Sequence, residues 1–309
     1  MLESFANFLQ NTGLYALISS GGIDAVKTII MIAIACVLLY LAIVKKFEPL
    51  LLLPIAFGML LSNLPMIKDS SAIMMHTEFF TNPEYMTDGK YINVGYICQH
   101  GGLLDLLYLG VKLGIYPPLI FVGIGCMTDF GPLIANPKSI LLGAAAQFGV
   151  FFTFVGALVL SALVPSINFG IKEAASIGII GGADGPTAIY VTKSLAPALL
   201  PAIAVAAYSY MALIPVIQPP IMKLMTRKKD RMIVMEQLRP VSKTEKILFP
   251  IIVTIIVALI IPDAVSLVGC LMLGNLMKES GVVERLTKMA QNELMNIITL
   301  FLGVTLCAG

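Results

Sequence analysis

Long uncharged apolar runs alternate with short polar or glycine- and proline-rich interruptions along this chain of 309 residues. Several runs approach the roughly 20 residues that an α-helix needs to cross a bilayer. The helices that this pattern predicts cover about residues 26–44, 49–64, 117–127, 139–164, 199–225, 247–261 and 264–277. Residues 103–114 are apolar but contain Asp105 and Lys112, which indicates an interfacial or re-entrant segment. The pattern predicts an all-α, polytopic membrane protein with discontinuous helices.

Two polar segments interrupt the apolar pattern. Residues 65–99 are too polar to lie in lipid, and we interpret them as an inserted loop. Residues 223–246 hold eight of the twenty Lys and Arg residues. A basic loop between two membrane spans belongs on the cytoplasmic side. We therefore expect a single transmembrane domain over residues 1–309, embedded in a lipid bilayer.

Two regions of the sequence resemble each other weakly. Pro117–Gly131 and Pro262–Asn275 each begin with proline and contain a Val-Gly core followed by cysteine. Transporters are often built from two such repeats with broken helices at matching places. This predicts an inverted-repeat, transporter-like fold whose second repeat starts near residue 247. The last apolar run, 297–309, has thirteen residues and is too short to cross about 30 Å of hydrocarbon, so we expect a chain truncated at the C-terminus with an incomplete second repeat.

The composition narrows the class of protein further. Apolar residues make up 58% of the chain, charged residues only 12%, and the mean hydropathy is +0.92. An ordinary soluble domain has about 25% charged residues. These values exclude a disordered protein, a nucleic-acid-binding tail and a typical cytosolic enzyme. His76, Cys98 and His100 are too sparse for a zinc site, and the absence of a Walker A motif gives no support for direct ATP coupling.

Asp184 is the one acidic residue between Glu173 and Asp230. It lies in IGIIGGADGPTAIYVTK, where glycines and Pro186 disfavour a continuous helix. Irregular backbone at membrane depth is tolerated only where it lines a cavity or ion site. The Asp184 carboxylate, the Thr187 hydroxyl and the freed carbonyls are oxygen donors, which hard cations prefer. We therefore favour a site for Na+ or a proton over the alternative, an Asp-Gly-Pro turn at the membrane surface.

Two further polar interruptions are weaker candidates for a site. Thr128–Pro137 contains Asp129, but a turn between two helices needs the same residue types. Tyr208 and Tyr210 lie in the apolar run LLPAIAVAAYSYMALIPVIQPP. Either hydroxyl could bind a cation or relay a proton if it lay opposite Asp184, or it could simply hydrogen-bond across helices.

Four longer motifs allow a closer identification. They are GGADGPTAIYVTKSLAP, MTDFGPLIANPKSILLGAAAQFG, AYSYMALIPVIQPP and LVGCLMLGNLMKESGVVERL. In them the chain resembles the β subunit of the sodium-pumping biotin-dependent decarboxylases, which act on oxaloacetate, methylmalonyl-CoA or glutaconyl-CoA. The resemblance runs from about residue 114 to residue 309. The segment 65–99 has no place that we could assign in the family pattern.

The resemblance implies a function and a set of partners. A carboxyltransferase α subunit moves the carboxyl group onto biotin of a carrier protein, and the β subunit decarboxylates that carboxybiotin, consumes a proton and exports Na+. No biotin-attachment motif of the AMKM kind occurs in this chain, so a partner supplies the biotin. The resemblance also implies a small γ/δ membrane subunit, a homo-oligomer, and a multi-pass location in the inner (cytoplasmic) membrane.

The resemblance also implies roles for individual residues. Asp184 and Tyr210 match the residues that handle Na+ and protons in the family, and we expect both to take part in catalysis. The Na+ ligands that we predict are Asp184, Thr187, Tyr210 and Asp129. A second broken helix of the family, which supplies further Na+ ligands, would follow residue 309.

Two other functions fit the residues alone. A secondary Na+-coupled carboxylate transporter would also use broken helices and an intramembrane Asp, so composition and spacing do not separate it from a pump. A purely structural membrane subunit would leave the buried Asp184 without a purpose.

Overall fold

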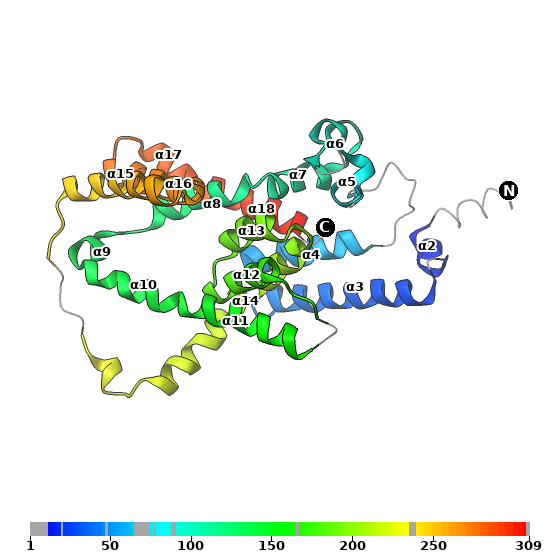
Figure 1. The fold of residues 1–309 in the computed structure, drawn as a ribbon, viewed down its shortest axis with the longest axis horizontal. Coiled ribbons are helices and arrows are strands. Elements are labelled where there is room, and N and C mark those ends of the chain that lie inside the picture. Colours follow the sequence, from blue (N-terminus) through cyan, green and yellow to red (C-terminus); the bar gives the residue numbers. More distant parts are fainter. Residues whose placement is uncertain are drawn as a thin grey trace. The chain divides into compact units, whose positions relative to one another are not determined.

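The computed structural model describes residues 12–19, 21–46, 49–64, 75–76, 78–87, 91–164, 167–234 and 239–306. These residues are almost entirely helical, as the apolar pattern predicts (Figure 1). The chain forms two compact units, one made of Met1–Leu113 with Thr299–Gly309 and the other of Gly114–Ile298.

The first unit is built around two packed helices, α3 and α4. Gly58 of α4 approaches the backbone of Val304, and Gly303 approaches Pro54 so closely that a Cβ atom there would lie 2.6 Å from the proline Cβ. These contacts join the last turns of α18 to α4 within the unit. The elements of the first unit are α2 (Gly13–Ser19), α3 (Gly22–Ile43), α4 (Pro49–Asn63), α5 (Glu78–Thr81), η1 (Pro83–Tyr85), β1 (Met86–Thr87), β2 (Tyr91–Ile92), α6 (Val94–His100) and α7 (Leu103–Lys112).

The described part of the polar segment 65–99 is a small folded element, with β1 and β2 paired antiparallel. The Phe79 ring packs edge-on against Tyr85 and Tyr96, at centroid distances of 5.4 and 5.3 Å, and stacks on His76 at 4.6 Å. His76 in turn hydrogen-bonds through Nδ1 to the carboxylate of Asp105 in α7, at 2.7 Å. This contact between a partly buried histidine and a buried carboxylate anchors the segment to α7.

The second unit contains the apolar helices from α8 onward. Its elements are α8 (Tyr116–Met127), α9 (Gly131–Ala135), η2 (Pro137–Ser139), α10 (Ile140–Ala146), α11 (Phe148–Leu163), α12 (Ile171–Gly178), η3 (Ile179–Gly182), α13 (Gly185–Leu195), η4 (Pro197–Leu199), α14 (Leu200–Met225), η5 (Asp230–Met232), α15 (Lys243–Ile260), η6 (Pro262–Ala264), α16 (Val265–Ser280), α17 (Glu284–Met289), the π-helical turn η7 (Ala290–Leu294) and α18 (Met295–Leu306), whose residues from Thr299 belong to the first unit.

Helices α8 and α16 pack against each other through one glycine each (Figure 1). A Cβ atom at Gly125 would collide with the carbonyl oxygen of Leu271, and one at Gly274 would collide with that of Val122. In each case the partner residue lies three positions before the other glycine, so the contact is reciprocal. The Cys126 thiol donates to the Gly274 carbonyl at 3.3 Å, and the Asn275 amide donates to the Gly125 carbonyl at 3.5 Å. The two helices are therefore related by a local two-fold arrangement.

Two helical segments are long and apolar enough to cross a membrane, Ala25–Ile43 and Pro137–Leu163. Two bent helix pairs, which include α7 with α8 and the two halves of α14, would raise the number to four among the described residues. Only 11% of the first span and 6% of the second are buried inside the protein. Such large exposed apolar surfaces are stable in lipid but not in water. The prediction of a helical membrane protein is confirmed at this level.

The expected segments correspond closely to the observed helices, with one refinement. Residues 139–164, predicted as one span, form two consecutive helices, α10 and α11, that meet at Gln147.

Helix α15 begins where a capping box forms, because Ser242 Oγ accepts the Glu245 N–H at 3.2 Å and Glu245 accepts the Ser242 N–H at 2.8 Å. This reciprocal pair satisfies two backbone donors that the helix itself leaves unpaired.

Candidate functional site

The chain is broken at Asp184, as the sequence predicts. Helix α12 ends at Gly178, a short 3-10 turn (η3) follows, and Ala183 adopts a left-handed conformation with φ of 55°. Helix α13 then starts at Gly185, with Pro186 in its first turn, where the missing N–H is not needed. The glycine-rich sequence thus produces two short helices separated by an irregular turn.

The backbone of the broken segment lies directly on α11. A Cβ atom at Gly149 would lie 2.6 Å from the Gly181 carbonyl oxygen, and one at Gly181 would collide with both the Gly149 carbonyl and the Thr153 hydroxyl. Glycine is therefore required on both sides of this contact. The close approach fixes the end of η3 against a helix that is otherwise exposed to lipid.

The Asp184 side chain caps the N-terminus of α13. Its Oδ1 accepts the Thr187 N–H at 3.2 Å, and its Oδ2 accepts the Thr187 hydroxyl at 2.5 Å. Asp184 and Thr187 are each half-buried. The structure therefore brings together two of the four predicted Na+ ligands, three residues apart at the first turn of α13.

The Asp184 carboxylate lies between two helix ends of opposite polarity, the carboxyl end of η3 and the N-terminus of α13. The last carbonyls of a helical segment have no intrahelical partner and carry partial negative charge. At this break the carboxyl end of η3 meets the Asp184 carboxylate within two residues. Broken membrane helices use such carbonyls to coordinate Na+ or H+.

One face of α14 covers the site. Tyr208 is 2% exposed, and its ring lies against Gly185, where a Cβ atom would come within 2.8 Å of the tyrosine Cζ. The Gly185 N–H donates to the Met211 sulfur at 3.2 Å. Tyr210 lies on the other side of α14 and is 39% exposed, because residues two apart on a helix do not share a face. Of the two tyrosines in the motif, the one beside the Asp184 segment in this structure is Tyr208.

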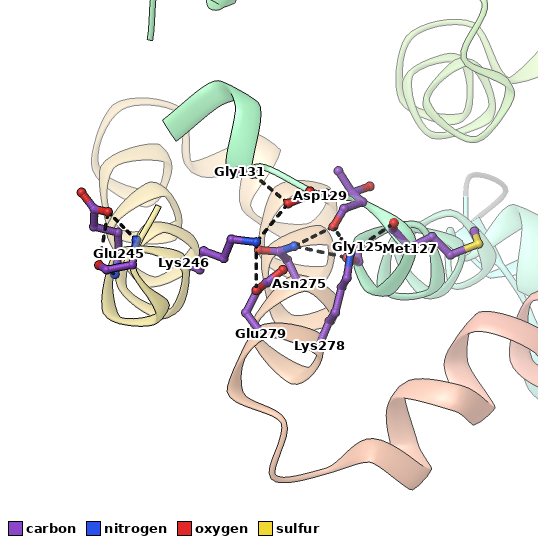
Figure 2. A network of polar contacts seen from close by, with 11 residues as sticks. Gly125, Met127, Asp129, Gly131, Glu245, Lys246, Asn275, Lys278 and Glu279 are labelled. Carbon is purple, nitrogen blue, oxygen red and sulfur yellow. Dashed lines mark hydrogen bonds and ion pairs between the residues drawn. The ribbon is translucent and has the colours of Figure 1, made fainter. Parts of the chain in front are cut away.

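Asp129, the fourth predicted ligand, lies in a separate polar network (Figure 2). Its Oδ1 accepts the Gly131 N–H at 2.9 Å and pairs with the Lys246 ammonium at 3.5 Å, and its side chain is 56% exposed. The Gly131 hydrogen bond, followed by the positive charge of Lys246, holds the pKa of the Asp129 carboxyl below its ordinary value. Lys246 also faces Glu279 at 3.8 Å. Asp129 is thus paired with an ammonium group and is not joined to Asp184.

Polar side chains also donate hydrogen bonds to the backbone carbonyls at the end of α8. The sequence pattern did not predict these contacts. Asn275, 1% exposed, and Lys278 donate to the Thr128 carbonyl at 3.0 Å each, and the Gln291 amide donates to the Cys126 carbonyl at 2.5 Å (Figure 2 shows the first two). These donors satisfy carbonyls that would otherwise be unpaired at the end of an apolar helix. The available signal was Asn275 within an otherwise apolar stretch, since a buried amide needs partners.

Together, the fold and the site define a helical membrane protein in which a helix break holds an acidic, oxygen-rich cluster. This arrangement is typical of ion-coupled membrane proteins.

Comparisons with known proteins identify the family. The sequence model of the Na+-transporting oxaloacetate decarboxylase beta subunit matches residues 27–309. The chain is 56% identical over 308 residues to the methylmalonyl-CoA decarboxylase subunit beta of Propionigenium modestum, covering 100% of this chain and 74% of that protein. It is 53% identical to the glutaconyl-CoA decarboxylase subunit beta of Acidaminococcus fermentans (89% of this chain, 64% of that protein) and 50% identical to the oxaloacetate decarboxylase beta chain of Haemophilus ducreyi (91% and 71%).

The chain therefore belongs to the family of Na+-transporting decarboxylase β subunits. The resemblance found in the sequence motifs is confirmed, and so is the function of a decarboxylase subunit that couples decarboxylation to Na+ export. The relatives do not favour the alternative of a secondary carboxylate transporter.

Proposed function

We propose that Asp184 and Thr187 form the Na+ site of this subunit, together with the carbonyls at the end of η3. The helix break supplies backbone oxygens, and the Thr187 hydroxyl already lies 2.5 Å from the carboxylate. A carboxylate among neutral oxygens suits a hard monovalent cation. The same carboxylate can bind a proton when the cation has left, so one group can serve both ions.

The reaction that we assign to this site begins with carboxybiotin supplied by a partner carrier protein. Loss of CO2 from the carbamate breaks an N–C bond and leaves a nitrogen that takes up one proton. Within this chain, Asp184 would release Na+ on one side of the membrane and bind a proton from that same side. Its carboxylate would then deliver the proton toward the reacting carbamate, which couples ion export to proton consumption.

Tyr210 and Asp129 have less direct support as Na+ ligands. The Tyr210 side chain is 39% exposed, and Asp129 is paired with Lys246. For either residue to reach the ion at Asp184, α14 would have to turn or the Lys246 pair would have to open. Both roles therefore stay predictions that depend on a conformational change.

The assembly that we propose follows from the family. Its partners are a biotin carrier, a carboxyltransferase α subunit and a small γ/δ membrane subunit, and the subunit is a homo-oligomer in the inner membrane. The basic segment 223–246 would face the cytoplasm, where the carrier protein arrives. An inverted-repeat architecture also belongs to this proposal; the reciprocal contact of Gly125 with α16 and of Gly274 with α8 supports an internal two-fold relation.

The observation that carries the proposal is the Asp184 carboxylate at the break, with the Thr187 hydroxyl bound to it. The test is Asp184→Asn in the complete decarboxylase complex, reconstituted into proteoliposomes. We expect Na+-stimulated decarboxylation and ²²Na+ uptake to fall to background, at least a hundredfold, because an amide cannot exchange Na+ for a proton.

The matched control is Asp263→Asn. Asp263 follows Pro262 at the start of a helical turn, much as Asp184 lies two residues before Pro186, but it is exposed, and the control should retain the wild-type Na+ dependence. Wild-type Na+ dependence in Asp184→Asn would eliminate the proposed site.

A further inference from the structure

The Tyr208 hydroxyl is a buried polar group that the function described so far does not use. Tyr208 is 2% exposed, and its hydroxyl has no hydrogen-bond partner among the described residues. Buried polar groups are almost always paired, because leaving one unpaired costs the hydration that it had in water. An unpaired buried hydroxyl is therefore able to bind a ligand or an ion where its surroundings supply one.

The surroundings of Tyr208 show which ligand that is. Tyr208 belongs to α14, whose Ile203 and Ala207 pack with Ala188 of α13. The carbon that carries the hydroxyl, Cζ, lies against Gly185, the residue that follows Asp184. The hydroxyl therefore lies beside the chain segment that carries the Asp184 carboxylate.

Gly185 makes this approach possible. A Cβ atom at this position would lie 2.8 Å from the tyrosine Cζ and 3.1 Å from the Met211 sulfur. A side chain there would separate the ring from the first turn of α13. The glycine therefore serves two purposes: it interrupts the helix, and its lack of a side chain leaves room for the Tyr208 ring beside the interruption.

We infer that the Tyr208 hydroxyl is a direct oxygen ligand of the alkali cation held at Asp184, buried on the protein side of the site. The inference rests on the proposed Na+ site and adds a residue to it. A phenol hydroxyl contributes a neutral oxygen, so it adds coordination without adding charge. Tyr208 would thereby help the site to distinguish Na+ from a proton, which needs only one oxygen.

The test compares Tyr208→Phe with Tyr108→Phe in the complete complex. Tyr108 is a matched control, because it is 1% exposed and its hydroxyl also lacks a partner among the described residues, but it lies in α7 of the first unit. Two quantities are measured: the Na+ concentration for half-maximal decarboxylation, and the rise in unfolding temperature of the complex caused by added NaCl relative to choline chloride.

For Tyr208→Phe we expect the half-maximal Na+ concentration to rise about tenfold, since the loss of about 1.4 kcal/mol of binding is a factor of ten. The Na+-induced rise in unfolding temperature should shrink, because at a given concentration a ligand that binds the folded state more weakly stabilises it less. In choline chloride the unfolding temperature should match wild type, since the ring is retained. Tyr108→Phe should leave both Na+ readouts unchanged.

A wild-type Na+ requirement in Tyr208→Phe would overturn the inference. If Asp184→Asn were inactive at the same time, the Na+ site at Asp184 would stand without Tyr208. If Asp184→Asn also kept its Na+ dependence, the proposed function would fail as well, so the two failures are distinguishable.

Discussion

Two carboxylates, Asp105 in the first unit and Asp184 in the second, lie at helix N-termini but differ in their burial and in their hydrogen bonds. Asp105 in α7 is completely buried and accepts three hydrogen bonds, from the His76 N–H at 2.7 Å, from His76 Nδ1 at 2.7 Å and from the Gly102 N–H at 2.8 Å. Asp184 at the start of α13 is half-buried and accepts two, both from Thr187.

The difference teaches how to separate a structural acid from a functional one. The three donors at Asp105 come from two chain segments and tie the folded part of the segment 65–99 to α7. The donors at Asp184 come from its own first turn, and the neighbouring Gly185 lies against the ring of Tyr208 from α14, whose hydroxyl has no partner among the described residues. A carboxylate with filled acceptors holds the fold, whereas one with spare coordination beside an unpaired hydroxyl can bind an ion.

The variant with the largest expected effect, and the most direct test of this comparison, is Asp105→Ala. We expect a loss of about 3–5 kcal/mol in stability, because removing the buried carboxylate leaves the partly buried His76 side chain and two backbone donors without their acceptor. Thermal unfolding of the purified complex in detergent measures the loss, and the surviving folded fraction should keep the wild-type Na+ requirement. His100→Ala is the control, since His100 stacks on Tyr96 but does not contact Asp105. A destabilised variant with an altered Na+ requirement would show that Asp105 also serves the ion path.

A smaller effect is expected for Gly185→Ala, which perturbs the other carboxylate. The new Cβ atom would displace Tyr208 or Met211 at a cost of about 1–3 kcal/mol, as for other overpacked sites. We also expect weaker Na+ binding, measured as the half-maximal Na+ concentration for decarboxylation. Gly143→Ala is the control, because nothing lies within 4 Å of a Cβ atom at Gly143 in α10 and alanine is the better helix former there. Unchanged Na+ binding in Gly185→Ala would argue that the position of Tyr208 does not matter to the ion.

The smallest effect is expected for Asp129→Asn, a third carboxylate that is paired but exposed. The Asp129–Lys246 pair is solvent-screened, so we expect a loss of less than about 1 kcal/mol at neutral pH. The Gly131 hydrogen bond and Lys246 lower the folded-state pKa of Asp129, so its contribution is present above the unfolded-state pKa of about 3.9 and disappears as the pH falls through the folded value. Unfolding temperatures of the variant and the wild type should therefore converge once the pH falls below the folded-state pKa of Asp129. A difference that persisted there would mean that the effect is not electrostatic.

Much of the fold was predictable because the membrane imposes simple rules. Apolar length and interrupting glycines and prolines located most of the helices, including α3, α4, α14 and α16, and the break at Asp184. The folded element within 65–99 was not predictable, since its stability depends on one long-range pair, His76 with Asp105, and on rings that meet only after folding. The reciprocal contact of Gly125 and Gly274 was not predictable either, because the weak repeat aligns Gly123 with Gly269 and does not say which helix faces meet.

The candidate site was predictable in part for the same reason. Asp184 and Thr187 are three residues apart, so local turn geometry alone brings their side chains together. Tyr208 and Tyr210 could not be separated by pattern, because the rotation of α14 about its axis decides which of them faces the break. That rotation is set by the packing of Ile203 and Ala207 on α13 and η3, which is a property of the assembled unit.

By itself, the sequence determined that this protein is helical, that it belongs in a membrane and that its chain breaks around an acidic residue, because hydropathy and backbone preference act within a few residues. Only the tertiary structure decided which oxygen atoms converge on that residue and which acidic groups are already neutralised by partners. Those outcomes depend on contacts between residues more than twenty positions apart, such as Gly185 with Met211 and Asp129 with Lys246, and no local preference encodes them.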